Sequence, residues 1–336
     1  MSLSRATRFS LFFLVLCTSF APAASAKWKY FRAGNPGDSD AKPRGGLALM
    51  GGGAQQDPAF RFLCNAANGG DFLILRASTE DDYAQQVNKE IFALCTLNSA
   101  ATIVFNDRED SGDPKVLQII EHAAVIFIAG GDQSNYLRFW QDTPVQAALN
   151  KHIAAGKPIG GSSAGLAILG EFSFASIIDT IHSPEALADP YGNKVTLARD
   201  FLQIPLLAGT ITDTHFAKRD RMGRLAVFMA RILQDGWATQ IRAIGVEENA
   251  AVLVTPDGKA ETVGTGHAYF LEAKKIPAAC RRKVPLTFGG ISVHRAPSGS
   301  AFHFGEWKGE NGQGDYYQLS VENGVIKAVG SDHGIY

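Results

Sequence analysis

Short apolar runs alternate with amphipathic stretches over residues 46–170. Five runs are mainly apolar: 46–50, 71–77, 101–106, 125–129 and 158–161. Runs of this length predict strands that are buried on both faces, as in parallel sheets. Three stretches between them have helical spacing: 83–97, 114–123 and 135–155. The alternation predicts an α/β fold with a doubly wound, mostly parallel sheet that is covered by helices on both faces.

The second half of the chain has a less regular pattern. We expect a strand over 206–213 and a helix from about residue 220 to residue 234. Pro144 predicts a break or kink within the long helix 135–155, because proline removes a backbone donor.

Short strand-like runs toward residue 336 predict antiparallel hairpins. We expect 289–297 to pair with 301–307, and 318–321 to pair with 325–329. The second pair surrounds Asn323-Gly324, which is a strong hairpin signal. Two further runs, 242–246 and 250–254, precede a Pro-Asp-Gly turn.

The first 26 residues have the features of a secretory signal peptide. Arg5 and Arg8 precede an apolar run, and Ala24-Ser25-Ala26 matches a cleavage site. We therefore expect cleavage after Ala26 and export to the periplasm or the medium. The alternative is an uncleaved membrane anchor.

The remaining chain divides into three segments by composition. Residues 27–45 are polar and contain several glycines and prolines, which predicts an N-terminal arm with little regular structure. We assign residues 46–310 to the α/β domain and residues 311–336 to a C-terminal β-hairpin extension.

The charge balance argues against polyanionic partners. The formal net charge is −1, and it becomes −3 when the two positive charges of Arg5 and Arg8 are removed. A near-neutral chain has no overall attraction to nucleic acid or to an anionic membrane. We expect neither partner after cleavage. A homodimer is compatible with the sequence, which leaves the oligomeric state open.

Three cysteines remain when Cys17 leaves with the signal peptide: Cys64, Cys95 and Cys280. An odd number permits one disulfide and one free thiol, or three buried thiols. A bridge between Cys64 and Cys95 is one of the open pairings. The sequence contains no Cys-x-x-Cys motif and no His/Cys cluster, so we expect no metal and no other cofactor.

Gly161-Ser162-Ser163-Ala164-Gly165 joins a predicted strand to a predicted helix. Gly-x-Ser-x-Gly in this context is typical of a nucleophile elbow, a strained turn that projects the central serine. Ser163 is therefore the candidate nucleophile. The backbone N–H of Ala164 would lie beside it and stabilise an oxyanion. The alternative is a loop that needs small residues only for close packing.

A catalytic serine needs a general base and a group that orients this base. His215 is the best candidate base, because it follows a predicted strand at the sheet edge where ligands bind. His182, in a loop, is an alternative. Glu247 and Glu248 follow another strand, and their side chains must point in different directions. We expect one to support His215 and the other to face solvent, unless both belong to a solvated turn.

Two groups of residues near these candidates suit substrate binding. Arg221 and Arg224 share a helix face behind Arg219, and guanidinium groups hold carboxylates through paired hydrogen bonds. The alternative is a solvated helix edge. Gly130-Gly131-Asp132-Gln133 offers N–H groups near the elbow, but it lacks the Lys-Ser/Thr of a P-loop. Gly51-Gly52-Gly53 lacks the spacing of a dinucleotide site.

Four segments together resemble the cyanophycinase and dipeptidase E family of serine peptidases. They are AGGDQ at 129–133, GSSAG at 161–165, DTHFAKRDRMGRL at 213–225 and IGVEEN at 244–249. The similarity spans residues 46–305. It implies a fold similar to class I glutamine amidotransferases, with serine instead of cysteine at the elbow.

The resemblance also implies roles for individual residues. Ser163 matches the nucleophile, His215 the general base and Glu248 the acidic partner of the histidine. The positions that match oxyanion donors are Ala164 and either Gly131 or Asp132. The positions that match the substrate pocket are Gln133, Asp213, Arg219, Arg221 and Arg224.

The Arg-x-Arg-x-x-Arg run over 219–224 favours cyanophycinase over dipeptidase E. Cyanophycin is a poly-aspartate with arginine on each β-carboxyl, and an arginine-lined pocket suits the two α-carboxylates of each β-Asp-Arg unit. We therefore expect an exported serine exopeptidase that cleaves cyanophycin or, because Thr214 replaces the family's glutamine, a related aspartyl peptide. The alternatives are another acyl hydrolase, such as an esterase, and a non-catalytic binding protein.

Overall fold

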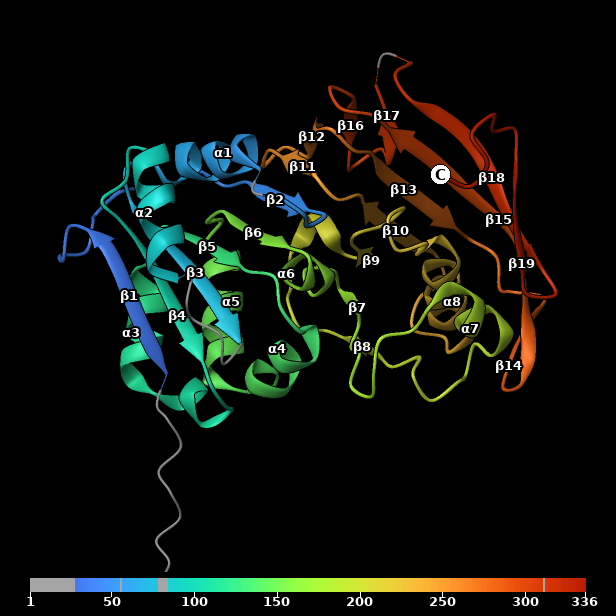
Figure 1. Ribbon diagram of the computed structural model, residues 1–336, viewed down its shortest axis with the longest axis horizontal. Helices are drawn as coiled ribbons and strands as arrows, with labels where there is room; N and C mark the ends of the chain where they lie inside the picture. The colour runs from blue at the N-terminus through green and yellow to red at the C-terminus, as the bar shows by residue number, and fades with distance from the viewer. Residues whose placement is uncertain (1–27, 55, 78–83, 311) are drawn as a thin grey trace, which may run out of the picture.

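The structure, a computed structural model, describes residues 28–54, 56–77, 84–310 and 312–336. Two β-sheets with helices packed on them make up this part of the chain (Figure 1). The predicted signal peptide, residues 1–26, lies outside the described residues. Among the described residues, no helix has the length and apolar character needed to cross a membrane.

The first sheet has ten strands in the order β1-β4-β3-β5-β6-β2-β11-β12-β16-β17. Its five central strands are parallel: β4 (Ser99–Phe105), β3 (Asp71–Ala77), β5 (Val125–Ile128), β6 (Ile159–Ser162) and β2 (Leu47–Met50). These are the five apolar runs of the sequence, which confirms a mostly parallel central sheet. The flanking strands are antiparallel: β1 (Lys29–Gly34), β11 (Ala250–Val254), β12 (Lys259–Gly264), β16 (Ala301–His303) and β17 (Lys308–Gly309).

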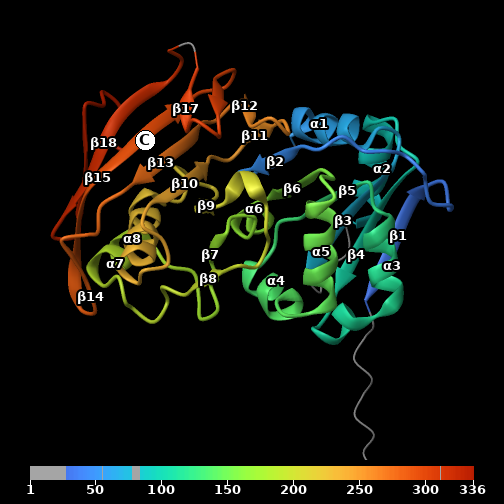
Figure 2. The same ribbon diagram turned by 180° about the vertical axis from the view of Figure 1, so that it is seen from behind.

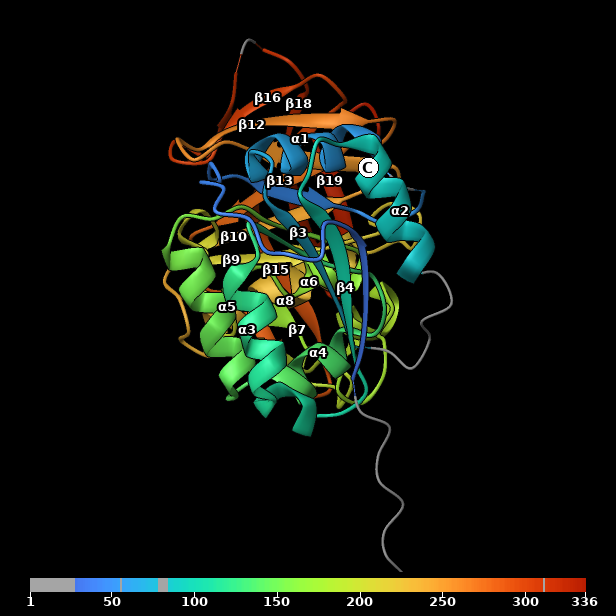
Figure 3. The same ribbon diagram turned by 90° about the vertical axis from the view of Figure 1, so that its left-hand side faces the viewer.

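Helices cover both faces of the first sheet, as Figure 3 shows. In β2, Leu47 and Leu49 pack into the core beneath three helices, α3 (Pro114–His122), α4 (Gln133–Trp140) and α5 (Pro144–Ala154). Ala48 and Met50 point to the opposite face, which is covered by α1 (Asp57–Ala67) and α2 (Ala84–Leu94). Both faces of the strand are therefore buried, and its sequence is apolar throughout.

The second sheet has nine strands, eight of them in the order β19-β18-β15-β13-β10-β9-β7-β8. Three are parallel: β7 (Phe172–Phe174), β9 (Thr210–Asp213) and β10 (Ile241–Val246). The others are antiparallel: β8 (Leu197–Arg199), β13 (Ala268–Ala273), β15 (Val284–Ala296), β18 (Asp315–Glu322), β19 (Val325–Val329) and β14 (Ala279–Arg281), which pairs with β15. Figure 2 shows α7 (Ser183–Ala188) and α8 (Met222–Gln234) against this sheet.

The break expected at Pro144 is present, whereas one strand is shorter than predicted. The helix expected over 135–155 is divided into two, because Pro144 starts α5 and Asp142 takes a left-handed φ of 57° before it. The strand expected over 206–213 begins only at Thr210, because Pro205 opens a 3₁₀ turn, η2 (Pro205–Leu207). A second 3₁₀ turn is η1 (Glu109–Gly112).

The pairing of the outer segments also differs from the prediction. Residues 27–45 contain β1, which pairs with β4 and is held by an ion pair of 3.0 Å between Arg32 and Asp71. The pair expected between 289–297 and 301–307 does not form, because β15 pairs with β13 and β18, while β16 pairs with β12 and β17.

The hairpin expected near Asn323-Gly324 is present as β18 and β19, and β18 pairs with β15 inside the second sheet. Both strands of this hairpin, β18 and β19, thus belong to that sheet, although the domain boundaries stay predictions.

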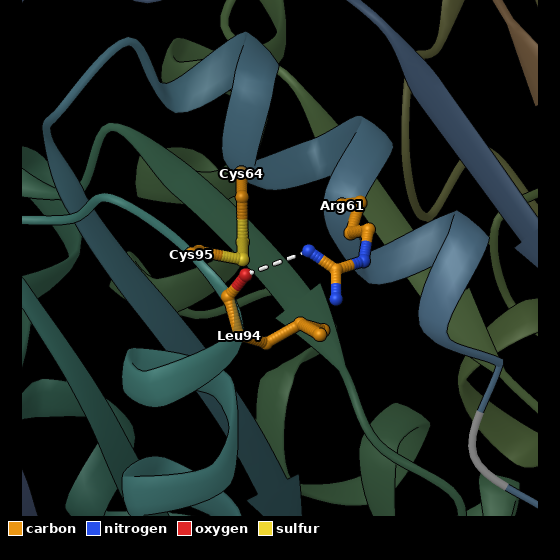
Figure 4. The surroundings of a disulfide bond; sticks show 4 residues. All are labelled: Arg61, Cys64, Leu94 and Cys95. Carbon is orange, nitrogen blue, oxygen red and sulfur yellow. Dashed lines mark hydrogen bonds between the residues drawn. A yellow bond between two sulfur atoms is a disulfide. The ribbon is translucent and has the colours of Figure 1, made fainter.

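A disulfide joins Cys64 of α1 to Cys95, directly after α2 (Figure 4). The two Cα atoms are 5.9 Å apart, and Arg61 donates a hydrogen bond of 3.1 Å to the carbonyl of Leu94 beside the bridge. Cys280 is a buried free thiol. Of the pairings that the sequence left open, the structure contains the bridge between Cys64 and Cys95.

Candidate active site

Ser163 occupies the turn between β6 and the short helix α6 (Ala164–Ala167). Its φ of 53° and ψ of −120° are strained for a residue with a side chain. Two flanking glycines make this turn possible. A Cβ on Gly161 would lie 2.6 Å from the backbone of Gly165, and a Cβ on Gly165 would lie 2.0 Å from the carbonyl oxygen of Ile128. The strand–turn–helix context required by the elbow motif is therefore present.

The candidate residues come from both sheets. Ser163 follows β6 of the first sheet, whereas His215 follows β9 and Glu248 follows β10 of the second. Sequence analysis placed His215 at the edge of the same sheet as the elbow. That expectation was wrong, because β9 pairs with β7 and β10 and not with the strands around β6.

The side chains of Ser163, His215 and Glu248 form a continuous chain of contacts. Ser163 Oγ lies 2.7 Å from His215 Nε2, and His215 Nδ1 lies 2.7 Å from Glu248 Oε1. The imidazole is nearly buried, and the carboxylate is about one quarter exposed, with side-chain exposures of 9% and 27%. Both ring nitrogens are therefore committed to the other two candidates.

The segment Gly51–Gly53 lies against His215. The carbonyl oxygen of Gly51 accepts the N–H of His215 at 2.8 Å, and the carbonyl oxygen of Gly52 accepts the N–H of Asn249 at 2.9 Å. A Cβ on Gly52 would lie 2.5 Å from the ring of His215, so only glycine fits. The sequence pattern did not predict this role, because these glycines were compared only with the spacing of a nucleotide site. Their position at the carboxyl end of β2 was the available signal.

Burial and neighbouring charges determine the protonation states of His215 and Glu248. Burial lowers the pKa of His215, and the positive charges of Arg219 and Arg221 lower it further, against the raising effect of Glu248. The hydrogen bond from His215 lowers the pKa of Glu248. At neutral pH the arrangement holds a neutral imidazole, which is able to accept a proton, beside an ionised carboxylate.

The other glutamate of the pair has structural partners. Glu247 accepts hydrogen bonds from the backbone N–H of His267 at 2.9 Å and from the hydroxyl of Tyr269 at 2.7 Å. Its side chain is mostly buried, with an exposure of 17%. The expectation that the second glutamate faces solvent was therefore wrong. His182, the alternative base, is exposed at the start of α7.

Backbone groups suited to an oxyanion surround Ser163. Ala164 is the first residue of α6, where N–H groups have no partner within the helix. A Cβ on Gly130 would lie 3.4 Å from the Cβ of Ser163, so the loop that leads to Gly131 and Asp132 runs beside the elbow. Asp132 caps α4 by accepting the N–H of Ser134 at 2.8 Å.

Gln133 is the first residue of α4, and its side-chain amide donates to the carbonyl of Phe174 at 3.3 Å. This contact joins the loop beside the elbow to the end of β7. Its predicted role in binding substrate stays a prediction.

Two of the three arginines bind the protein itself. Arg224 is 2% exposed and holds both carboxylate oxygens of Asp213, at 2.8 Å and 2.5 Å. Arg221 donates to the carbonyl and the hydroxyl of Thr214, at 2.9 Å and 3.0 Å, and lies 3.4 Å from Asp213. Arg219 is exposed on the loop after His215. Arg221 and Arg224, which were expected to hold a substrate carboxylate, thus contact the carboxylate of Asp213.

The buried charges around Asp213 are unbalanced. Burial alone would raise the pKa of Asp213, but Arg224 and Arg221 outweigh it and hold the pKa below its usual value. Burial lowers the pKa of Arg221 to about 10, so this guanidinium still carries a charge at neutral pH. Two cations face one anion beside the loop of His215, which leaves a net positive charge.

Among the described residues, no group of three or more His, Cys, Asp or Glu side chains is placed to hold a metal ion. The chemistry that this arrangement can support is nucleophilic attack by an activated hydroxyl, with stabilisation of an oxyanion.

Comparisons with known proteins agree with this chemistry. The family model for peptidase family S51 matches residues 48–261, which include the elbow and the segments of His215 and Glu248. A cyanophycinase from Synechococcus elongatus is 26% identical over 270 residues, which cover 77% of this chain and 79% of the relative. A cyanophycinase from Geminocystis herdmanii is 23% identical over 236 residues, which cover 69% and 81%.

A solved structure has a related fold. The crystal structure of a peptidase from an acI-B1 Actinobacterium aligns with a TM-score of 0.51 at 16% identity, covering 78% of this chain and 97% of the other. This likeness supports the mixed α/β architecture alone, and the finer similarity to class I glutamine amidotransferases stays a prediction. Because the family model covers more than half of the sequence, the chain belongs to peptidase family S51 and is a serine-type peptidase.

Proposed function

We propose that this protein is an exported exopeptidase that hydrolyses β-aspartyl isopeptide bonds, using Ser163, His215 and Glu248 as a catalytic triad. The observation that carries the proposal is the unbroken contact chain, 2.7 Å from Ser163 Oγ to His215 Nε2 and 2.7 Å from His215 Nδ1 to Glu248 Oε1. In the resting state, the neutral imidazole donates its Nδ1–H to Glu248 and accepts the hydroxyl proton of Ser163 at Nε2.

The reaction proceeds through an acyl-enzyme. Ser163 Oγ attacks the amide carbonyl while His215 Nε2 takes its proton. The oxyanion receives hydrogen bonds from the N–H of Ala164 and from the N–H of Gly131 or Asp132. His215 then gives the proton to the leaving amine, and the acyl–serine ester forms as the amide bond breaks. A water molecule, deprotonated by His215, hydrolyses the ester and regenerates the free serine.

The substrate proposal rests on charge around the base. Arg219 is exposed beside His215, and the pair of Arg221 and Arg224 leaves one positive charge unmatched by Asp213. Such a pocket suits a substrate with α-carboxylates close to the scissile bond. We propose that Arg219 contacts a substrate carboxylate directly, that Gln133 also contacts the substrate, and that Asp213, Arg221 and Arg224 shape the pocket.

Export is supported by two features. The first 26 residues have a signal-peptide pattern, and the bridge between Cys64 and Cys95 suits an oxidising compartment. If the proposal holds, the mature protein recovered outside the cytoplasm begins at Lys27. Recovery of the intact N-terminus from the cytoplasm would contradict export and leave the peptidase proposal untouched.

The test of the substrate is a product analysis on purified cyanophycin granules. The wild-type protein is expected to release β-Asp-Arg dipeptide, identified by mass spectrometry, and the Ser163→Ala variant none. A wild-type protein that cleaves other aspartyl peptides and leaves granules intact would overturn the cyanophycin assignment. Turnover of neutral esters alone would favour an acyl hydrolase of different specificity.

A further inference from the structure

The loop that carries His215 depends on two strained residues. His215 has a φ of 46° and Asp220 has a φ of 48°, both in the left-handed region that residues with side chains avoid. Between them, the N–H of Arg219 bonds to the carbonyl of His215 and the N–H of Asp220 to that of Ala217, both at 3.0 Å. Surrounding contacts must hold such a conformation.

The inner side of the loop is held by α7. Ser183 Oγ donates to the carbonyl oxygen of Asp220 and accepts the N–H of Arg224 at 3.1 Å. This contact fixes the backbone where the chain turns into α8. It leaves the side chain of Asp220 and the N–H of Met222, the first residue of α8, to other partners.

Tyr336 supplies both partners through one hydroxyl. Its OH donates to Asp220 Oδ1 at 2.9 Å and accepts the N–H of Met222 at 2.8 Å. Burial raises the pKa of Tyr336, so the phenol stays protonated and keeps its donor. The hydroxyl therefore bridges the end of the loop to the start of α8.

The ring of Tyr336 holds the other end of the loop. It packs edge-on against Phe216, which directly follows His215, with ring centroids 5.9 Å apart at 81°. It also packs edge-on against Tyr269 of β13, at 6.0 Å and 87°. Phe216 is fully buried, and its N–H bonds to the carbonyl of Val246 at 3.2 Å.

Tyr336 lies far outside the matched family region, which ends at residue 261. Its segment follows the β18–β19 hairpin and is tied to that hairpin by a hydrogen bond of 2.9 Å from the hydroxyl of Tyr317 to the carbonyl of Ile335. The segment after β19 thus reaches back to the loop that carries His215.

We propose that Tyr336 is a positioning residue for the proposed reaction, holding the 215–222 loop so that His215 meets Ser163 and Glu248. The inference rests on the proposed function. Tyr336 does not touch the reacting atoms, and it acts through Phe216 at one end of the loop and through Asp220 and Met222 at the other.

The test measures the reactivity of Ser163 without a peptide substrate. Wild type, Tyr336→Phe and Tyr316→Phe are treated with a fluorophosphonate, and modification of Ser163 is followed by mass spectrometry, with Ser163→Ala as the blank. Tyr316 is a matched control, since its hydroxyl accepts an equivalent hydrogen bond, of 2.8 Å from the N–H of Gly309, and its ring is half exposed. We expect about a five- to hundredfold slower reaction for Tyr336→Phe, the range expected when both hydrogen bonds of its hydroxyl are lost, and no change for Tyr316→Phe.

The pH profile of labelling separates positioning from mere stability. Three charged groups act on His215: Glu248 raises its pKa, and Arg219 and Arg221 lower it, while Lys218 acts on Glu248. A loosened loop hydrates the imidazole, and its pKa then moves up toward the ordinary value. We expect the acid limb of the labelling rate to shift to higher pH in Tyr336→Phe and to stay in place in Tyr316→Phe.

The Asp220→Gly variant gives a second test of the inference, since glycine tolerates a φ of 48° and the substitution removes the side-chain acceptor of Tyr336. Its effect combined with Tyr336→Phe is expected to be smaller than the sum of the two single effects. Unchanged labelling and an unchanged acid limb in folded Tyr336→Phe would overturn the inference while the proposed function stands. A wild type that fails to label at Ser163 would remove both. If Tyr336→Phe does not fold, the labelling rate of Asp220→Gly and the acid limb of its pH profile test the inference by the same criteria.

Discussion

Glu248 reaches His215 from a different strand and orients the ring that faces Ser163. The hydrogen bond of 2.7 Å to Nδ1 selects the tautomer whose Nε2 is free to accept a proton. A neutral amide at position 248 would occupy the same space without favouring that tautomer. The carboxylate therefore contributes orientation and charge, and the two contributions are separable by substitution.

We expect Glu248→Gln to lower kcat by about 10²- to 10⁴-fold with a much smaller change in KM, as is typical when the acidic partner of a catalytic histidine is neutralised. The measurement is steady-state kinetics on an aspartyl peptide, with thermal unfolding as a check of the fold. Glu247→Gln is the informative comparison, because Glu247 bonds to His267 and Tyr269 instead of His215. A variant at 248 with wild-type kcat would exclude this glutamate from the triad.

The positive charge of Arg219, an exposed residue, should affect how activity depends on pH. Arg219 lowers the pKa of His215, although burial has the larger effect. Because the base must be neutral, activity rises with pH through this pKa. Arg219→Gln raises the pKa, so the acid limb of kcat/KM is expected to move to higher pH. Lys218→Gln acts mainly on Glu248 and should move it less. A shift to lower pH for Arg219→Gln would contradict the electrostatic argument.

Sequence motifs at strand ends pointed to Ser163 and His215, and the resemblance to the family selected Glu248 over Glu247. Neither identified Gly52 or Tyr336. The need for glycine at position 52 comes from the ring of His215, and the role of Tyr336 comes from Phe216 and Met222. Both contacts join residues more than 100 positions apart, which no local pattern encodes.

At the scale of elements, apolar runs predicted the strands of the parallel sheet well because both faces of each strand are buried. The same patterns did not assign strands to sheets. β16 has only three residues, too few for its pattern to specify a partner, and its Phe302 stacks on Phe270 of β13 with ring centroids 3.7 Å apart. Pro144 was recognised as a break, but its position at the first turn of α5 separates two helices instead of kinking one.

The disulfide between Cys64 of α1 and Cys95 after α2 should stabilise the fold measurably. It closes a loop with a sequence separation of 31 residues, and the loss of chain entropy in the unfolded state corresponds to about 3–4 kcal/mol of stability. Paired substitution of Cys64 and Cys95 by serine should lower the free energy of unfolding in urea by about that amount. Reductant should have little effect on the free energy of unfolding of this variant. An equal loss in wild type and in the variant upon reduction would show that another thiol is responsible.

For the whole molecule, the two sheets meet where the chain passes from β10 to β11 through Glu247-Glu248-Asn249. A backbone hydrogen bond joins the sheets there, from the N–H of His215 to the carbonyl of Gly51 at 2.8 Å. The site is therefore assembled only when both sheets have folded and docked. Any condition that separates the sheets is expected to remove activity together with global stability.

Acid is expected to lower the stability of the folded protein, because two buried histidines resist protonation in the folded state. His152 is 4% exposed and His294 is 3% exposed, and burial lowers the pKa of each to about 4. The unfolded chain binds these protons near pH 6.5, so it gains protons before the folded protein does. Stability is then lost as pH falls from about 6.5 toward 4, by up to about 3 kcal/mol for each histidine.

His152→Gln keeps a side-chain N–H for the carbonyl of Pro158, which Nε2 contacts at 3.0 Å, and His294→Leu replaces a ring whose nitrogens have no hydrogen-bond partner. Each variant should flatten the dependence of unfolding free energy on pH between 6.5 and 4, measured by urea unfolding at several pH values. The slope is the decisive quantity, because either substitution also changes packing at every pH. Wild-type slopes in both buried variants would mean that other groups drive acid unfolding.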